Sequence, residues 1–212
     1  MISGVDIEIG CEAVWVRSVD PLRVVSSALV GGELTATRHI VNMHVPNGYR
    51  AEHPANDLTA FAQRLGIREP FVGLMTAART HDATPVTETA DGVTVTAIVT
   101  VGLGTPVSAG ESPPASWRPS TINTIVLLEA CLESAAAVNG VISATEAKVA
   151  ALADAGIVTP EGLLATGTVT DAVVVAWTGR GLRLRYLGPA ASGGWLVART
   201  VRRAVAEGLK RW

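Results

Sequence analysis

Several features that would define a protein class are scarce or missing in this chain of 212 residues. Its two cysteines, Cys11 and Cys131, are too few for a disulfide framework, so we expect reduced thiols and a cytoplasmic protein. The apolar runs are well short of the roughly 20 residues that a membrane-spanning helix requires. The N-terminal segment carries Asp6 and Glu8 and no cationic stretch, so we expect neither a signal peptide nor a membrane partner.

Charge is also scarce, since only 17% of the residues are charged and the formal net charge is −2. The cations near the end of the chain have the spacing of one solvated helix face, which argues against nucleic acid as a partner; they are Arg199, Arg202, Arg203, Lys210 and Arg211. The four histidines show no metal-ligand spacing such as HExxH. We therefore expect neither a metal site nor a resident cofactor.

What the chain does have is apolar sequence, 48% of its residues, which is enough for a sizeable core. Helical patterns alternate with strands and hairpin-like strand pairs. This order predicts a mixed α/β (α+β) protein in which helices cover a largely antiparallel or mixed sheet, with two stacked sheets between helix layers as the alternative. We expect one domain over 1–212, with possible halves at 1–104 and 120–212. The proline-rich loop 105–119 would divide the halves or form a flap over a site.

Local patterns predict where the elements lie. Strands are expected over 5–9, 13–16, 22–26, 37–45, 71–76, 93–101, 121–129, 163–177 and 183–187, and helices over 54–66, 134–156 and 195–210. The segment 79–91 is expected to be a polar excursion. On strand 37–45, Asn42 and His44 would be neighbours on one face, where they could hold a substrate carbonyl or do acid–base work. The alternative is that His44 is purely structural.

The stretch 163–181 runs from a small polar cluster into the apolar sequence 172–177; the cluster is Thr166, Gly167, Thr168, Thr170 and Asp171. Polar groups at the mouth of a buried strand are costly unless they hydrogen-bond each other or a ligand. A glycine there also lets another group approach the backbone. The cluster is therefore either a binding site or a hairpin corner whose threonines satisfy their own main chain.

In the helix expected over 134–156, one stripe is predicted to pack on the sheet; its members are Val138, Val141, Ile142, Thr145, Val149, Leu152 and Ala153. At about 100° per residue, Glu146 and Lys148 flank this stripe on opposite sides. Such boundary positions could reach into a cleft above the sheet. Two structural explanations compete: a capping box over Ser143–Glu146 with the helix starting after Gly140, and a lysine that snorkels.

Seven short segments, quoted in chain order, resemble those of one known family, the CbiZ family of adenosylcobinamide amidohydrolases. They are His39–Pro46 (HIVNMHVP), Gly73–Ala77 (GLMTA), Thr100–Leu103 (TVGL), Thr121–Thr124 (TINT), Thr145–Lys148 (TEAK), Ala165–Asp171 (ATGTVTD) and Tyr186–Pro189 (YLGP). The resemblance extends from about Ser26 to Leu209. One departure is Ala190–Trp195, where the family usually has a more polar segment that contains glycine.

The resemblance implies salvage of corrinoids for cobalamin (vitamin B12) biosynthesis. Such enzymes hydrolyse the amide that joins the aminopropanol arm of adenosylcobinamide to a propionate of the ring, giving adenosylcobyric acid, and some members act on complete cobamides. The corrinoid, with its cobalt, is then the substrate. A corrin has an apolar body fringed by amides, so its site should combine hydroxyl and amide side chains with apolar walls. The expected binding residues are Asn42, Thr121, Asn123, Thr166, Gly167, Thr168 and Thr170.

Amide hydrolysis needs an activated nucleophile, donors for the oxyanion and an acid for the leaving amine. One hypothesis makes Glu146 the base that activates water and Lys148 or His44 the acid. Asn42, Asn123 and the backbone near Gly167 would then hold the oxyanion. The other makes Thr166 or Thr168 the nucleophile, assisted by Glu146 or Asp171.

Two further functions compete with the amidohydrolase. The same clusters would suit a non-catalytic module that binds or delivers corrinoids. A phosphate- or nucleotide-binding protein that uses the region of Gly167 is disfavoured, because no Walker-type lysine follows and no GxGxxG opens a helix. Oligomerisation stays open.

Overall fold

Short runs of β-branched residues form the strands of this protein, whose structure is a computed structural model that describes residues 2–33, 35–114 and 121–212. Its helices are α1 (Pro54–Arg64), α2 (Ser134–Asp154) and α3 (Ser192–Leu209). Its strands are β1 (Val5–Ile9), β2 (Ala13–Ser26), β3 (Ala36–His44), β4 (Val72–Thr76), β5 (Thr84–Ala90), β6 (Val93–Thr100), β7 (Pro106–Val107), β8 (Asn123–Glu129), β9 (Cys131–Leu132), β10 (Gly167–Thr168), β11 (Ala172–Trp177) and β12 (Arg183–Leu184). Of the helices within the described ranges, none has the length and apolar character that crossing a membrane requires.

One eight-stranded sheet organises the chain, in the order β4-β3-β2-β11-β8-β6-β5 with β1 on β2. The pairs β3/β4 and β8/β11 are parallel and the other neighbours are antiparallel. Each parallel pair is joined through a helix, as parallel neighbours require: α1 follows β3 and α2 follows β8. The predicted mixed α+β class is therefore confirmed. Strands from both sides of the loop after β6 share this sheet, because β11 and β8 lie between β2 and β6.

The sheet bends so that its two halves stack on each other. Strand β2 belongs to both halves: its first part pairs with β1 and β3, its last part pairs with β11, and the register shifts between Arg17 and Leu22. One buried apolar cluster joins Val14, Ile40 and Leu74 of the first half to Ile125 and Val174 of the second. The arrangement therefore has two stacked layers of strands, the alternative that the sequence had left open.

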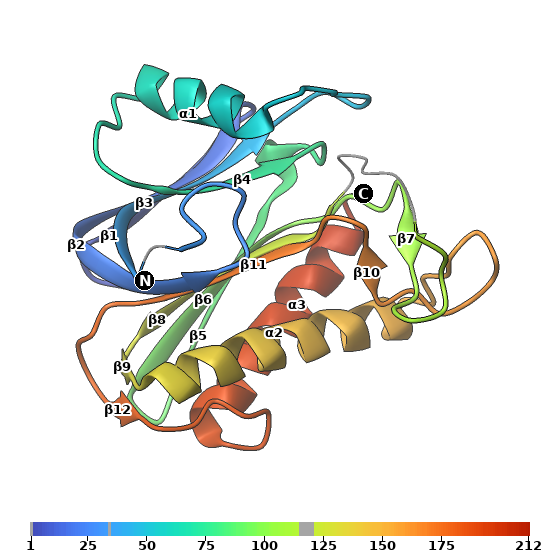
Figure 1. Cartoon of the computed structure of the whole chain (residues 1–212). Coiled ribbons are helices and arrows are strands. Elements are labelled where there is room, and N and C mark those ends of the chain that lie inside the picture. Colours follow the sequence, from blue (N-terminus) through green and yellow to red (C-terminus); the bar gives the residue numbers. More distant parts are fainter. Residues whose placement is uncertain (1, 34, 115–120) are drawn as a thin grey trace.

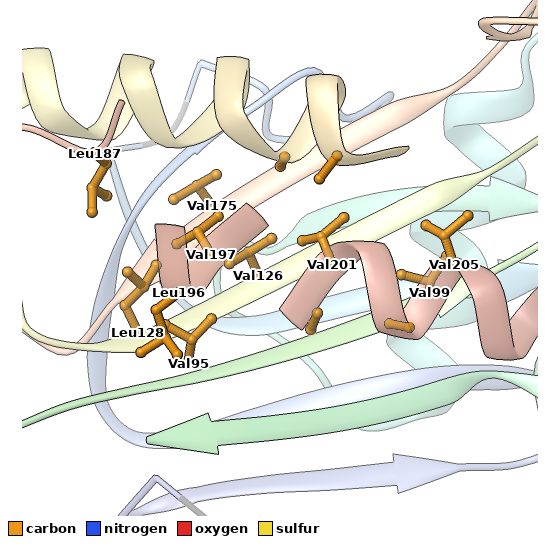
Figure 2. Packing of buried hydrophobic residues seen from close by; sticks show 14 of the residues in the cluster. Val95, Val99, Val126, Leu128, Val175, Leu187, Leu196, Val197, Val201 and Val205 are labelled. Atoms are coloured by element: carbon orange, nitrogen blue, oxygen red, sulfur yellow. The ribbon is translucent and has the colours of Figure 1, made fainter. Parts of the chain in front are cut away.

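Helices cover both outer faces of the stack (Figure 1). Helix α1 packs Leu58 and Phe61 against Val41 and Met43 of β3. On the opposite face, α2 and α3 cover β6, β8 and β11, and Figure 2 shows Leu196, Val197, Val201 and Val205 of α3 packed against this side of the sheet. Burying a leucine or valine side chain contributes about 1.5–3 kcal/mol, so these contacts hold both helices firmly on this face of the sheet.

Helix α2 packs through small residues, contrary to the stripe predicted from its larger apolar ones. Its buried positions are Ala136, Ala137, Gly140, Ser143, Ala144, Ala147, Lys148, Ala151 and Leu152, whereas Val138 is 53% exposed and Ile142 is 46% exposed. The helix lies so close to its neighbours that a Cβ on Gly140 would stand 3.3 Å from Leu187 and 3.4 Å from Val175. Close approach selects small side chains, so the larger ones face outward.

Other local expectations were also wrong. The polar excursion 79–91 contains β5, an edge strand whose Thr87 hydrogen-bonds Thr96 of β6 across the pair. The expected strands 13–16 and 22–26 are parts of the single strand β2, and the expected strand 163–177 is divided into β10 and β11. The capping box fails because Ser143 lies inside α2, where its hydroxyl donates to Leu187 O at 2.6 Å. The loop expected over 105–119 carries β7, and its last five residues lie outside the described ranges.

Candidate active site

A chain of hydrogen-bonded polar side chains crosses the end of the sheet where β3, β4 and β6 finish and β8 and β11 begin. We call it the polar chain; its members are Thr100, Asn42, Asn123, Thr121, Asp171, Thr168 and Lys148. Each of its threonines and asparagines is buried, and so is Lys148. The two stacked halves of the sheet both contribute, so the polar chain exists only in the folded protein.

Two asparagines join the stacked halves. Asn123 Nδ2 of β8 donates to Asn42 Oδ1 of β3 at 2.8 Å and to Met75 O of β4 at 2.9 Å. Asn42 Nδ2 in turn donates to Thr100 Oγ1 of β6 at 3.0 Å. Both amide hydrogens of Asn123 are thus committed to protein acceptors. Across the stack Asn42 thus contacts Asn123 and not His44.

Thr121 links this amide pair to the carboxylate of Asp171. Its hydroxyl lies 2.7 Å from Thr170 O and 3.2 Å from Asn123 Oδ1. The next residue, Ile122, donates its backbone N–H to Asp171 Oδ1 at 2.9 Å. The main chain that enters β8 therefore positions the carboxylate that precedes β11, which is its parallel neighbour.

Asp171 and Lys148 form a nearly buried ion pair at the other end of the polar chain. Lys148 Nζ of α2 lies 2.5 Å from Asp171 Oδ2, and the two side chains are 8% and 12% exposed. Thr168 donates its hydroxyl to Asp171 Oδ1 at 2.5 Å. The carboxylate therefore accepts an ammonium, a hydroxyl and a backbone N–H, and Lys148 does not snorkel to solvent.

Gly167 lets this ion pair lie against the backbone. A Cβ at that position would overlap Asp171 Oδ2 and stand 2.6 Å from Lys148 Nζ. The sequence had indicated that some group approaches the main chain closely here, and the group is the ion pair of the protein itself. Any side chain at position 167 would displace a buried charge.

Three predicted site residues lie away from the polar chain. Thr166 ties β10 to β7, since its backbone N–H donates to Val107 O at 2.8 Å and its hydroxyl accepts from Ala109 N at 2.9 Å. His44 is half-buried, and its Nδ1 lies 2.9 Å from Ala78 O. Glu146 is exposed in a separate groove of about 570 Å³ between α2 and α3. The structure thus does not bring Glu146 together with Lys148.

A cavity of about 200 Å³ opens beside the polar chain. Ser27, Asn123 and Thr170 supply its polar wall, and Leu29, Leu74 and Met75 supply apolar walls. This mixture of one amide, two hydroxyls and apolar side chains is typical of small-molecule sites. Within the described ranges, no group of three or more His, Cys, Asp or Glu residues is placed to hold a metal ion.

Thr100 and the carbonyl of Met75 belong to this site but were not among the predicted site residues. Thr100 is the last residue of β6, and only the stacking of the sheet brings it to Asn42. A backbone carbonyl carries no sequence signal at all. The hint available was that both residues fall within the segments GLMTA and TVGL.

Two solved structures share this fold. The PH0078 protein from Pyrococcus horikoshii OT3 matches with a TM-score of 0.54 at 12% identity, over 99% of this chain and 80% of its own. A beta-aminopeptidase from Burkholderia sp. matches with a TM-score of 0.52 at 13% identity, over 98% of this chain and 84% of its own. At such identities the likeness establishes the fold alone.

Sequence comparison gives the class of enzyme. A family model described as adenosylcobinamide amidohydrolase (CbiZ) matches residues 2–212. A Methanosarcina mazei protein named adenosylcobinamide amidohydrolase is 29% identical over 153 residues, which are 72% of this chain and 68% of that protein. The protein is therefore an amidohydrolase, an enzyme that acts on carbon–nitrogen bonds. It belongs to the adenosylcobinamide amidohydrolase (CbiZ) family, as its short segments had indicated.

Proposed function

We propose that the protein hydrolyses the amide bond between the aminopropanol arm of adenosylcobinamide and the corrin propionate, giving adenosylcobyric acid for corrinoid salvage in cobalamin biosynthesis. The observation that carries this proposal is that the residues of the polar chain come from the family-like segments of the sequence. Six of the seven family-like segments, far apart in the sequence, each contribute at least one atom to it or to its hydrogen-bond partners. Residues that a family shares for its chemistry are expected to meet in space in this way.

Asp171 is the better placed general base. Its Oδ1 already accepts the Thr168 hydroxyl, and the ion pair with Lys148 fixes its orientation. Glu146, in contrast, is exposed in the groove between α2 and α3. We therefore assign the base to Asp171. The Lys148 ammonium is the nearest positive charge for an oxyanion that forms beside the pair.

The Thr168 hydroxyl is the nucleophile that this geometry favours. As Oγ1 attacks the amide carbonyl, its proton passes to Asp171 Oδ1, and Asp171 then gives a proton to the departing aminopropanol nitrogen. The ester left on Thr168 is cleaved by water, which restores the hydroxyl and releases the carboxylic acid. In the competing version, a water bound beside Thr168 gives its proton to Asp171 and attacks directly.

The test is incubation of the purified protein with adenosylcobinamide, followed by mass spectrometry of released aminopropanol and adenosylcobyric acid. Thr168→Val keeps the shape but removes the hydroxyl, and Thr168→Ser keeps a hydroxyl. A threonine nucleophile predicts that only the serine variant turns over, with a rate loss in the valine variant of about a thousandfold or more.

Each other outcome has a defined meaning. Substantial turnover by Thr168→Val would leave water as the nucleophile. Loss of turnover in Glu146→Gln with full turnover in Asp171→Asn would return the base to Glu146. If the protein binds corrinoids but releases no aminopropanol from adenosylcobinamide or from complete cobamides, the hydrolase proposal fails and a binding module takes its place.

A further inference from the structure

A second and larger cavity lies at the same end of the sheet as the polar chain. Its volume is about 450 Å³, and the residues that matter for its chemistry are Asn47, Arg79, Asp82, Gly102, Arg211 and Trp212. It lies where the loops after β3, β4 and β6 meet the C-terminal end of α3. Figure 1 shows this end of α3 on the side of the molecule that also carries β7 and β10.

A backbone hydrogen bond joins the cavity wall to the polar chain. Gly102, which lines the cavity, donates its backbone N–H to Thr121 O at 3.1 Å. Thr121 thus contacts a wall residue of this cavity and, through Asn123 and Thr170, two wall residues of the 200 Å³ cavity. Thr121 and its hydrogen-bond partners therefore separate the two cavities, so different parts of one large substrate bound at the polar chain can occupy each of them.

The lining has the donors, acceptors and flat surfaces that a nucleoside needs. Arg79 is held between Asp82 Oδ2 at 2.8 Å and Arg211 O at 3.3 Å. In the part of the chain that the structure describes, no carboxylate pairs with the Arg211 guanidinium, and the Trp212 indole is 65% exposed. Guanidinium and indole planes stack on bases, and an asparagine amide such as that of Asn47 can bind the edge of adenine.

Asp82 is placed to bind a ribose. Its Oδ2 is paired with Arg79, and its other oxygen can accept hydrogen bonds from ribose hydroxyls, as acidic residues do in dinucleotide sites. The volume is also suitable, because pockets for small ligands are about 300–1,000 Å³. The 200 Å³ cavity is below that range and suits only a side arm.

We propose that the 450 Å³ cavity binds the adenosyl group of the corrinoid, with Asp82 accepting from the ribose hydroxyls and Arg211 facing the adenine. This inference rests on the proposed function, because it assigns the nucleoside of the same substrate to a subsite. The cavity would make the enzyme favour adenosylated corrinoids over those that carry a small axial ligand.

Isothermal titration calorimetry of the protein with 5′-deoxyadenosine measures nucleoside binding to this cavity in the absence of turnover. The variants are Asp82→Asn and Arg211→Met, and Arg64→Met, on α1 beside Phe61, is the matched control. We expect each cavity variant to weaken binding about tenfold or more, with the control unchanged. An analogue without the ribose hydroxyls should bind to the wild type more weakly than 5′-deoxyadenosine does. The affinity of this analogue should be the same for the wild type and for Asp82→Asn.

The same variants are then assayed with adenosylcobinamide and with dicyanocobinamide. The ratio of kcat/KM for the two corrinoids should fall about tenfold in each cavity variant. Unchanged nucleoside binding and an unchanged ratio would overturn the inference, and so would binding of inorganic phosphate in competition with 5′-deoxyadenosine. A protein that binds the nucleoside as expected but hydrolyses no corrinoid would refute the proposed function and leave the subsite standing.

Discussion

Removing Lys148 tests the ion pair at the centre of the site. Lys148→Met leaves the Asp171 carboxylate 12% exposed and without its counter-ion. Breaking a buried pair in this way costs about 3–5 kcal/mol. Asp171 keeps the N–H of Ile122 and the hydroxyl of Thr168, so we expect the low end, about 3 kcal/mol. A domain with a stability of about 5–15 kcal/mol stays folded after that loss.

The double variant Lys148→Met/Asp171→Asn separates stability from chemistry. An asparagine is neutral and its Oδ1 can accept the same two hydrogen bonds, so the free energy of unfolding should return to within about 2 kcal/mol of the wild type. Hydrolysis should stay abolished in both variants, because the base is gone from one and misoriented in the other. Urea unfolding followed by circular dichroism gives the stabilities.

The control is the only other lysine of the chain, Lys210, which is exposed at the end of α3. Lys210→Met should change stability by less than about 0.5 kcal/mol. If Lys148→Met costs no more than that control, the pair is not desolvated and the reasoning is refuted. If the double variant is as unstable as the single one, the cost does not come from an uncompensated charge.

Three further predictions concern single positions. Gly167→Ala should cost about 1–3 kcal/mol by overpacking and remove activity, because its Cβ would overlap the Asp171 carboxylate. The control is Gly188→Ala, whose new Cβ would have no atom of the described residues within 4 Å, and it should match the wild type in unfolding and turnover. Thr124→Val should keep or raise the melting temperature, because the buried Thr124 hydroxyl finds no hydrogen-bond partner among the residues that the structure describes. Burial, followed by the hydrogen bond and charge of Asp57, raises the pKa of Tyr49 from 10.0 to about 12. The neutral phenol thus contributes stability that is complete below pH 10 and is lost as the pH rises through about 12. Asp57→Asn should lower the pKa of Tyr49, measured by spectrophotometric titration in a protein whose other tyrosine is replaced by phenylalanine. An unchanged titration curve would contradict the assignment.

Local sequence was sufficient where one face of an element is apolar and the other is polar. The pattern of β3 predicted its bounds to within one residue and the common face of Ile40 and Asn42. The proline at the start of α1 and the glycine after it delimited that helix. It failed for α2, where alanine and glycine make the buried face and valine and isoleucine lie outside. Hydrophobic periodicity ranks side chains by their free energy of transfer from water. The buried face of α2 is selected instead by side-chain size, because the backbone of α2 lies very close to α3 and the sheet.

The sequence by itself determined the family and the mixed fold class, and it singled out every member of the polar chain except Thr100, because short segments carry chemical identity independently of where they fold. Only the tertiary structure decided which of these residues meet. The stacking of the two halves of the sheet brings Asn42 to Asn123, and the packing of α2 turns Lys148 inward to Asp171 while it leaves Glu146 exposed. A helix position two residues away faces a direction about 200° different. The choice between two charged neighbours on α2 therefore depended on the burial of one helix face, which is a property of the whole fold.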